Sequence, residues 1–395
     1  MNKQLRIFIA GWACVLAGCT TLPAPTAVST ADLFDDSKFK PPAEVVESDS
    51  LFTLSPAMRQ YIDQPSFRSQ VRREGAAMGM LEALYKKSEL KLDYEATRTR
   101  PAAATFMDRK GNCLSLVIMT AAFAKALNLD IVYQDVVMDE QWSRAGGLYV
   151  SNTHVNLSLA NRGSSLASER SLGDRVVIDF IRLSDSAKQR MYPLSERTIE
   201  AMYLNNRAGE ALTEGRVDDA YWWARAAVQK DPSFMTGYNT LGVAFQKQRL
   251  YAGAEKVYKR ALERAPEDPI VMHNLVQVLA ALGKADESAA MAKRLATIEP
   301  FPPFHFFEKG LHALNAGKAE EAKGWFAREL RRAPYSHELH FWLAMTHLRL
   351  GDARSARTEL AAAIDNSTGS DETRRYSAKL NYLRSLASGA RPLTQ

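Results

Sequence analysis

The sequence predicts an α+β domain, in which a helix packs on an antiparallel sheet, followed by an all-α solenoid of helical hairpins. The second half of the chain has a fixed period, because four prolines follow one another at intervals of 34 residues. These are Pro232, Pro266, Pro300 and Pro334. A constant period of this length is typical of stacked supersecondary units. The first half instead combines a long apolar helical segment with three short segments rich in β-branched residues, which predicts a mixed domain.

The chain begins with the features of an exported protein. Lys3 and Arg6 precede an apolar run over residues 7–17, which is too short to cross a bilayer as a helix. A basic head followed by a short apolar run predicts a signal peptide over residues 1–18.

The end of this signal, LAGC at residues 16–19, resembles the lipobox of bacterial lipoproteins. The resemblance implies that Cys19 is acylated, becomes the mature N-terminus and anchors the protein to a membrane. In that family Thr20 after the cysteine implies the outer membrane, so we expect a lipid-anchored protein of the bacterial cell envelope that faces the periplasm. The alternative is an ordinary signal peptide in which the cysteine stands by chance.

The mature chain is long enough for two or three domains. Residues 19–50 are rich in Pro, Ala, Ser and Asp and predict a flexible tether. We assign residues 51–200 to the α+β domain, residues 201–370 to about five repeats, and residues 371–395 to a capping helix and tail.

Charge and histidine spacing argue against two classes of function. The net charge of +6 falls to about +4 when Lys3 and Arg6 leave with the signal, and no basic block or aromatic-interleaved basic stripe follows. We therefore expect no nucleic-acid partner. His337 and His340 are three residues apart rather than four as in a metal-binding HExxH helix, so we interpret them as packing residues and predict no metal or cofactor.

The 34-residue units resemble the tetratricopeptide repeat. The unit over residues 235–268 matches best, with signature residues Tyr238, Leu241, Gly242, Phe245, Ala254, Tyr258, Ala261 and Pro266. The resemblance implies a concave surface that binds a protein or peptide, here a partner or substrate in the envelope. Residues 371–387 predict the polar-faced capping helix that a solenoid needs.

Cys113 is the only cysteine after residue 19. Asn112 is a good N-cap, so Cys113 is expected in the first turn of a helix that runs to about residue 127. The positive end of a helix favours a thiolate and so a nucleophilic sulfur. The alternative is a buried cysteine that serves as a small core residue.

Three candidate strands follow this helix, over residues 131–138, 153–161 and 175–181. His154 is the only histidine of the first half, and Asp179 interrupts an apolar strand. A Cys, a His and an Asp can supply a nucleophile, a base and a group that orients the base. Each also has a structural interpretation, as a hydrogen-bonded histidine or as an aspartate at a strand end.

Residues from about 75 to 182 resemble the transglutaminase-like superfamily, relatives of papain-type cysteine proteases. The match lies in GNC at residues 111–113, THVN at 153–156 and VIDF at 177–180. The resemblance implies that Cys113, His154 and Asp179 form a catalytic triad, with the thiol in hydrogen-bonding reach of one ring nitrogen and the carboxylate on the other. Trp142 and Gln134 are candidates for an oxyanion-hole side chain or, alternatively, packing residues.

Two functions follow from these patterns. The first is a membrane-anchored cysteine acyl-transfer enzyme, in which a Cys113 thioester is resolved by water or by an amine. The pattern leaves open a peptidase, an amidase or a transamidase, and a substrate among peptidoglycan stem peptides or envelope proteins. The second is a non-catalytic envelope scaffold or adaptor that acts through its repeats.

Overall fold

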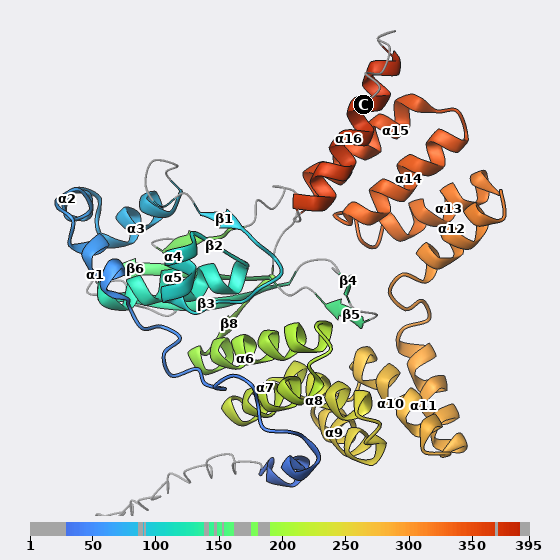
Figure 1. Cartoon of the computed structure of the whole chain (residues 1–395), viewed down its shortest axis with the longest axis horizontal. Coiled ribbons are helices and arrows are strands. Elements are labelled where there is room, and N and C mark those ends of the chain that lie inside the picture. The colour runs from blue at the N-terminus through green and yellow to red at the C-terminus, as the bar shows by residue number, and fades with distance from the viewer. Residues whose placement is uncertain are drawn as a thin grey trace, which may run out of the picture.

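The structure is a computed structural model. It describes residues 29–85, 90, 92–137, 142–145, 148–151, 154–161, 175–180, 190–367 and 370–387. Within these ranges an α+β part is followed by a row of helical hairpins (Figure 1). The expected signal peptide, Cys19 and the end of the expected tail from residue 388 lie outside the described residues. Among the described residues, no helix combines the length and the apolar character needed to cross a membrane.

Helix α5 (Cys113–Ala126) is the centre of the α+β part. It begins where the sequence predicts, because Asn112 caps it: the side-chain oxygen accepts the backbone N–H of Ser115 at 2.9 Å. Of its 14 residues, 12 are buried, so the helix is apolar on every side and shows no amphipathic period. Four shorter helices precede it: α1 (Pro56–Asp63), α2 (Pro65–Glu74), α3 (Ala76–Tyr85) and α4 (Ala102–Asp108).

The predicted antiparallel sheet is present next to α5. Its strand order is β7-β6-β3-β8, and every neighbouring pair is antiparallel. The strands are β3 (Leu129–Val137), β6 (His154–Asn161), β7 (Val176–Ile178) and β8 (Arg190–Leu194). The first three match the predicted segments, whereas β8 is an additional edge strand.

Two smaller pairs of strands complete this part. Strands β1 (Asp93–Tyr94) and β2 (Lys110–Gly111) run parallel, which brings Tyr94 beside the start of α5. Strands β4 (Trp142–Ala145) and β5 (Leu148–Ser151) form a hairpin.

Within residues 190–367 ten helices form five hairpins, and a further helix lies within residues 370–387. The hairpins are α6 (Glu196–Thr213) with α7 (Val217–Lys230), α8 (Met235–Lys247) with α9 (Tyr251–Arg264), α10 (Pro269–Ala281) with α11 (Ala285–Ile298), α12 (His305–Asn315) with α13 (Ala319–Leu330), and α14 (His337–Arg349) with α15 (Ala353–Asp365). Helix α16 (Ser370–Ala387) packs against α15. The second half is therefore a helical solenoid, as predicted.

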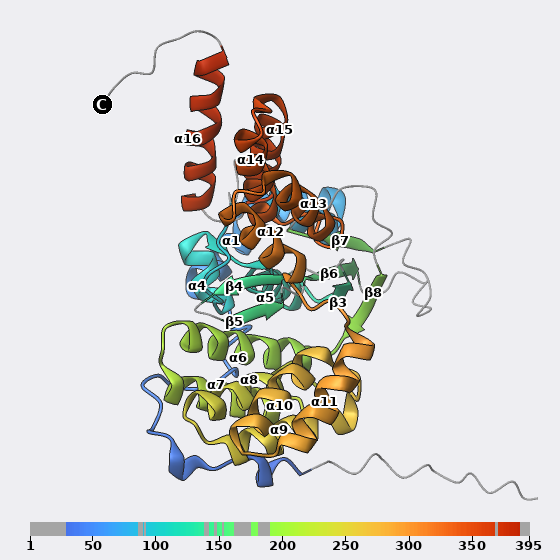
Figure 2. The same ribbon diagram turned by 90° about the vertical axis from the view of Figure 1, so that its right-hand side faces the viewer.

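Residues 29–50, part of the segment predicted to be a flexible tether, are packed against the solenoid instead. We call residues 29–50 the strap. In both views it runs along the first hairpins and passes beneath α9 (Figures 1 and 2). The Phe39 ring stacks on Tyr221 of α7 with 3.7 Å between ring centroids, and Asp32 pairs with Arg260 of α9 at 3.1 Å. Aromatic burial and ion pairs together offset the cost of ordering the strap.

The apolar core is continuous through the first part of the molecule and then breaks. One cluster of buried residues extends from Leu33 in the strap, through α5 and the sheet, to Leu279 in α10. Two separate clusters begin at Phe304 and Ala344, and a small third cluster of Ala211, Leu212 and Ala220 lies within the first hairpin. The α+β part and the first three hairpins thus share one core.

Candidate functional site

Cys113 is the first residue of α5, as expected, and it is largely buried. It is 8% exposed and makes no disulfide. Its sulfur lies 3.6 Å from the Tyr94 hydroxyl, which β1 brings there through its pairing with β2. Burial raises the pKa of Tyr94, and the neighbouring Cys113 raises it further, so this hydroxyl stays protonated and able to donate to the sulfur.

His154 and Asp179 lie on neighbouring strands and form a close pair. His154 begins β6, Asp179 directly follows β7, and the distance from His154 Nε2 to Asp179 Oδ1 is 2.8 Å. A carboxylate only accepts hydrogen bonds, so Nε2 carries a proton, and Nδ1 is the nitrogen that can exchange a proton with another group. Nδ1 is buried and forms no hydrogen bond.

Both Asp179 and Cys113 change the pKa of the His154 imidazole. Burial alone would lower the pKa of His154, but the hydrogen bond to Asp179 and the interaction with Cys113 raise it to about 9. Cys113 contributes to this rise in pKa through a side-chain hydrogen bond and through its charge, so the sulfur lies close to the ring, although the contact at Nδ1 is not well aligned. In enzymes without substrate such contacts are often long.

Asn156 is a residue of this site that the sequence reasoning missed. Its side-chain N–H donates to Asp179 Oδ2 at 2.9 Å, so both carboxylate oxygens are held. Asn156 is 1% exposed, and its side-chain oxygen has no hydrogen-bond partner. The sequence could have indicated Asn156, because it lies two residues after His154 on the same strand and alternate residues of a strand lie on one face.

The structure describes the side chain of only one of the two candidates for an oxyanion-hole donor, Gln134 and Trp142. Gln134 pairs across the sheet with Asn156, is buried, and has a side-chain oxygen without a partner, so no contact identifies it as a donor toward Cys113. Trp142 lies in β4, and the position of its ring is outside the described part of the structure.

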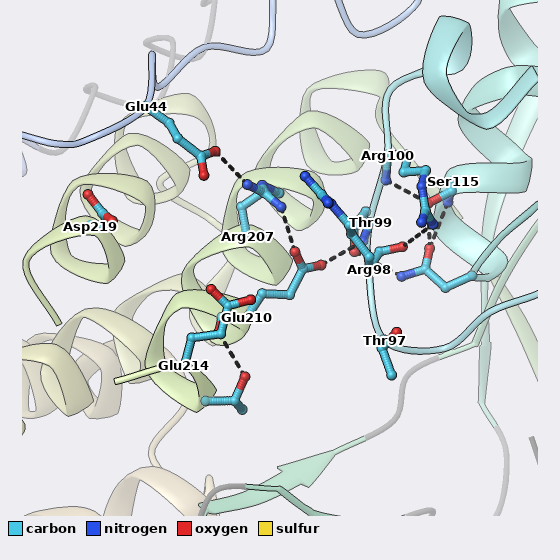
Figure 3. A network of polar contacts seen from close by, with 12 residues as sticks. Glu44, Thr97, Arg98, Thr99, Arg100, Ser115, Arg207, Glu210, Glu214 and Asp219 are labelled. Atoms are coloured by element: carbon cyan, nitrogen blue, oxygen red, sulfur yellow. Dashed lines mark hydrogen bonds and ion pairs between the residues drawn. The ribbon is translucent and has the colours of Figure 1, made fainter. Parts of the chain in front are cut away.

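A buried polar network joins α5 to the first repeat hairpin (Figure 3). Glu210 of α6 accepts the backbone N–H of Thr99 at 2.6 Å, and Thr99 Oγ1 accepts a hydrogen bond from Asn112 at 2.8 Å. Beside this network a cavity of about 340 Å³ opens between the strap, the loop over residues 98–101 and helices α6 and α7.

The first helices of three successive hairpins carry a row of asparagines. Helices α6, α8 and α10 contact one another in sequence and each contributes one: Asn205, Asn239 and Asn274. Asn274 donates to Asn239 at 2.9 Å, whereas the Asn205 side-chain oxygen is buried without a partner. The row offers amide groups at roughly the repeat spacing.

The histidines singled out in the sequence make ordinary structural contacts. His340 lies 2.7 Å from Glu359 and 3.0 Å from the Pro334 carbonyl, and His337 lies 2.9 Å from the Tyr376 hydroxyl. Within the described residues, no group of three metal-ligating side chains gathers.

A comparison with protein families finds a match in the second half of the chain. The family model described as "Tetratricopeptide repeat" matches residues 239–303 and 307–371. The C-terminal half contains tetratricopeptide repeats. Such repeats generally bind protein or peptide partners.

Several solved structures are similar to part of the chain. They include TTC0263, a tetratricopeptide protein of Thermus thermophilus, at 19% identity over 46% of this chain and 99% of that one, with a TM-score of 0.29. YrrB, described as having an unusual peptide-binding site, matches at 20% identity over 45% of this chain and 92% of that one, with a TM-score of 0.25. PilF of Pseudomonas aeruginosa matches at 19% identity over 48% of this chain and 94% of that one, with a TM-score of 0.27. No curated protein matches the chain significantly.

Proposed function

We propose that this chain is a partner-binding scaffold whose first three repeat hairpins hold an extended peptide on their inner side. The observation that carries the proposal is the row of Asn205, Asn239 and Asn274. An amide side chain presents both a donor and an acceptor, which is what the backbone of an extended peptide needs. The unsatisfied oxygen of Asn205 supports this, because a buried polar atom without a partner is costly until a ligand supplies one.

A peptide-display selection on the full chain provides the probe for this proposal. The affinity of an enriched peptide is then measured for wild type, for Asn205→Ala with Asn239→Ala, and for Gln229→Ala, an exposed amide on α7. Loss of two buried contacts is expected to weaken binding at least about tenfold, with no effect of the α7 change. Equal binding by all three proteins would rule out the asparagine row as the peptide site.

A second candidate function is cysteine acyl transfer at Cys113. The observation in its favour is the convergence of a helix-start thiol, an imidazole and a carboxylate with the 2.8 Å contact between His154 and Asp179. The 8% exposure of Cys113 and the tetratricopeptide-repeat match in the second half favour the scaffold instead. For these reasons acyl transfer stands second.

In this mechanism His154 Nδ1 takes the proton of the Cys113 thiol, while Asp179 holds the ring in the required tautomer. The thiolate attacks an amide carbonyl, and backbone N–H groups at the start of α5 receive the negative charge of the oxygen. The His154 imidazolium gives its proton to the leaving amine, and expulsion of that amine leaves a thioester. Water or a second amine then attacks the thioester and releases the Cys113 thiol.

Labelling with iodoacetamide tests the second candidate. If the imidazole activates the sulfur, Cys113 of the wild type reacts at least about tenfold faster at neutral pH than Cys113 of His154→Ala. Equal rates in the two proteins would leave Cys113 as an ordinary core thiol.

We further propose that acylated Cys19 anchors the protein in the bacterial cell envelope, at the outer membrane and facing the periplasm. The lipobox-like sequence supports this. Replacement Cys19→Ser is expected to move the protein from the membrane fraction to the soluble fraction. Retention in the membrane fraction would contradict the anchor.

A further inference from the structure

The start of α5 is held from outside its own domain. Helix α6 of the first repeat lies against the loop over residues 97–101, and the contact is a specific one. Glu210 accepts the Thr99 backbone N–H at 2.6 Å with one carboxylate oxygen and Arg207 at 2.7 Å with the other (Figure 3). Thr99 is 2% exposed, so this backbone donor has no access to water as an alternative partner.

From Thr99 the contacts lead directly to the cap of α5. Thr99 Oγ1 accepts a hydrogen bond from the Asn112 side chain at 2.8 Å. The Asn112 oxygen in turn accepts both the backbone N–H of Ser115 at 2.9 Å and its hydroxyl at 2.8 Å. Each amide atom of Asn112 is therefore fixed, one toward the repeat and one toward the helix.

The same loop also reaches Tyr94, the other neighbour of Cys113. The backbone N–H of Arg100 donates to the Ser115 hydroxyl at 2.8 Å, and the Arg100 guanidinium pairs with Glu95 at 3.0 Å. Glu95 directly follows Tyr94, whose hydroxyl lies 3.6 Å from the Cys113 sulfur. A displacement of residues 97–101 would thus disturb the cap before Cys113 and the strand that carries its hydroxyl neighbour.

We propose that Glu210, a residue of the first tetratricopeptide repeat, is a positioning residue for the Cys113 thiol. It holds Thr99, Thr99 holds Asn112, and Asn112 keeps the first turn of α5 in the geometry that directs its backbone N–H groups at the sulfur. The repeats and the α+β part then form one functional unit. This inference rests on the second candidate function, in which the thiol is reactive.

The strap completes the arrangement. Glu44 pairs with Arg207 at 2.6 Å, on the side of the guanidinium opposite Glu210 (Figure 3). Arg207 is therefore oriented by two carboxylates and cannot easily draw Glu210 away from Thr99.

The test measures the rate of iodoacetamide labelling of Cys113 in the full chain at about pH 7 and about pH 9. Variant Glu210→Ala removes the acceptor for Thr99, and Thr99→Val conserves volume while removing the hydroxyl that accepts from Asn112 and also contacts Glu210. Both are expected to label about three- to tenfold more slowly than wild type at neutral pH, because a poorly held helix start stabilises a thiolate less well. At the higher pH, where thiols ionise unaided, the difference is expected to shrink.

Two further variants separate positioning from general damage. Glu210→Gln keeps an oxygen that can accept the Thr99 N–H and is expected to stay within about twofold of wild type. Glu214→Ala removes a more exposed carboxylate at the C-terminal end of α6, which pairs with Arg216, and is expected to have no effect. Thr99→Val keeps the test decisive if Glu210→Ala does not fold.

The outcomes distinguish this inference from the function on which it rests. If wild type and His154→Ala label equally, the acyl-transfer function fails and the inference fails with it. If wild type labels faster than His154→Ala while Glu210→Ala and Thr99→Val both match wild type, the function survives and the positioning role is overturned.

Discussion

At His154, burial and hydrogen bonding act on the imidazole in opposite directions. Burial lowers the pKa of the ring, yet Asp179 and Cys113 raise it to about 9, so the charged form is favoured in the folded chain. The other titratable groups that face the site are Tyr94 and Asp135. Burial raises the pKa of the Asp135 carboxyl, and the charge of His154 counteracts that rise. Among the contacts that raise the pKa of His154, the hydrogen bond to Asp179 is the strongest, so Asp179 is the principal partner of the imidazolium.

The pH dependence of stability follows from this pair. A histidine whose pKa is 6.5 when free and about 9 when folded stabilises the fold fully below about pH 6.5. That contribution is lost as the pH rises through about 9. Asp179→Asn is expected to lower the free energy of unfolding by about 2–3 kcal/mol near pH 6 and by much less near pH 9.5.

Urea unfolding of both proteins across this pH range measures the difference. Asp130→Asn is the control, because it breaks the ion pair to Arg175 on the same sheet with an aspartate that is half exposed. It should cost less than about 1 kcal/mol, with no trend between these pH values. A parallel pH dependence of wild type and Asp179→Asn would contradict the assigned role of Asp179.

Sequence reasoning could anticipate part of this site. His154 and Asp179 stand on strands that pair as neighbours, so their proximity follows from strand order. The hydroxyl of Tyr94 beside Cys113 does not follow, because it depends on parallel pairing of two-residue strands that leave little signal. The burial of Cys113 could not be predicted from the sequence either, because the first turn of a helix can hold either a reactive cysteine or a core cysteine.

Among the elements, the crossing of α8 and α9 depends on a missing side chain. A Cβ atom on Gly242 would lie 2.2 Å from the Tyr258 ring, which is fully buried. Gly310 stands in the same relation to Phe326 two repeats later, with a closest approach of 2.6 Å. Glycine at this position lets an aromatic ring of the second helix lie directly on the backbone of the first.

Substitution at this crossing is expected to separate packing from helix propensity. Gly242→Ala forces the ring aside and should destabilise the protein by about 1–3 kcal/mol. Gly209→Ala, in α6, meets nothing within 4 Å and should instead stabilise by about 0.5–1 kcal/mol through better helix propensity. Thermal unfolding of both variants measures the two effects. A destabilisation of similar size in both would refute the packing argument.

The elements that the sequence predicts best are those with a long period. Five hairpins follow from the 34-residue spacing, because each repeat buries the same face against the next. Strand β8 was missed since Pro193 lies within it, and proline is poorly compatible with a central strand. Its edge position in the order β7-β6-β3-β8 makes that proline tolerable.

Across the whole molecule, the strap shows how long-range contacts override local composition. Residues 29–50 have the proline and polar content of a tether, but Phe39 and Leu33 are buried against helices about two hundred residues away in sequence. The Trp222 indole also donates to the Lys40 carbonyl at 2.6 Å. No local pattern contains this information, because the receiving surface exists only after the repeats have stacked.

The solenoid is divided between its third and fourth hairpins. No residue of α11 is buried, and the core that ends at Leu279 resumes only at Phe304. In both views α12–α16 stand apart from α6–α11 (Figures 1 and 2). In a repeat protein, the free energy of unfolding is the sum of the intrinsic stability of each repeat and the contribution of each interface between neighbouring repeats. Where one interface is missing, the repeats on its two sides unfold independently.

We therefore expect two unfolding transitions by calorimetry, one for the strap, the α+β part and hairpins one to three, and one for α12–α16. Leu241→Ala, at a fully buried position of α8, should lower only the first transition, and Leu343→Ala, in the core of α14, only the second. Each replacement should cost about 2–5 kcal/mol within its own unit, because a buried leucine leaves a cavity. A single transition that both variants shift together would mean that α11 and α12 transmit stability despite sharing no buried core.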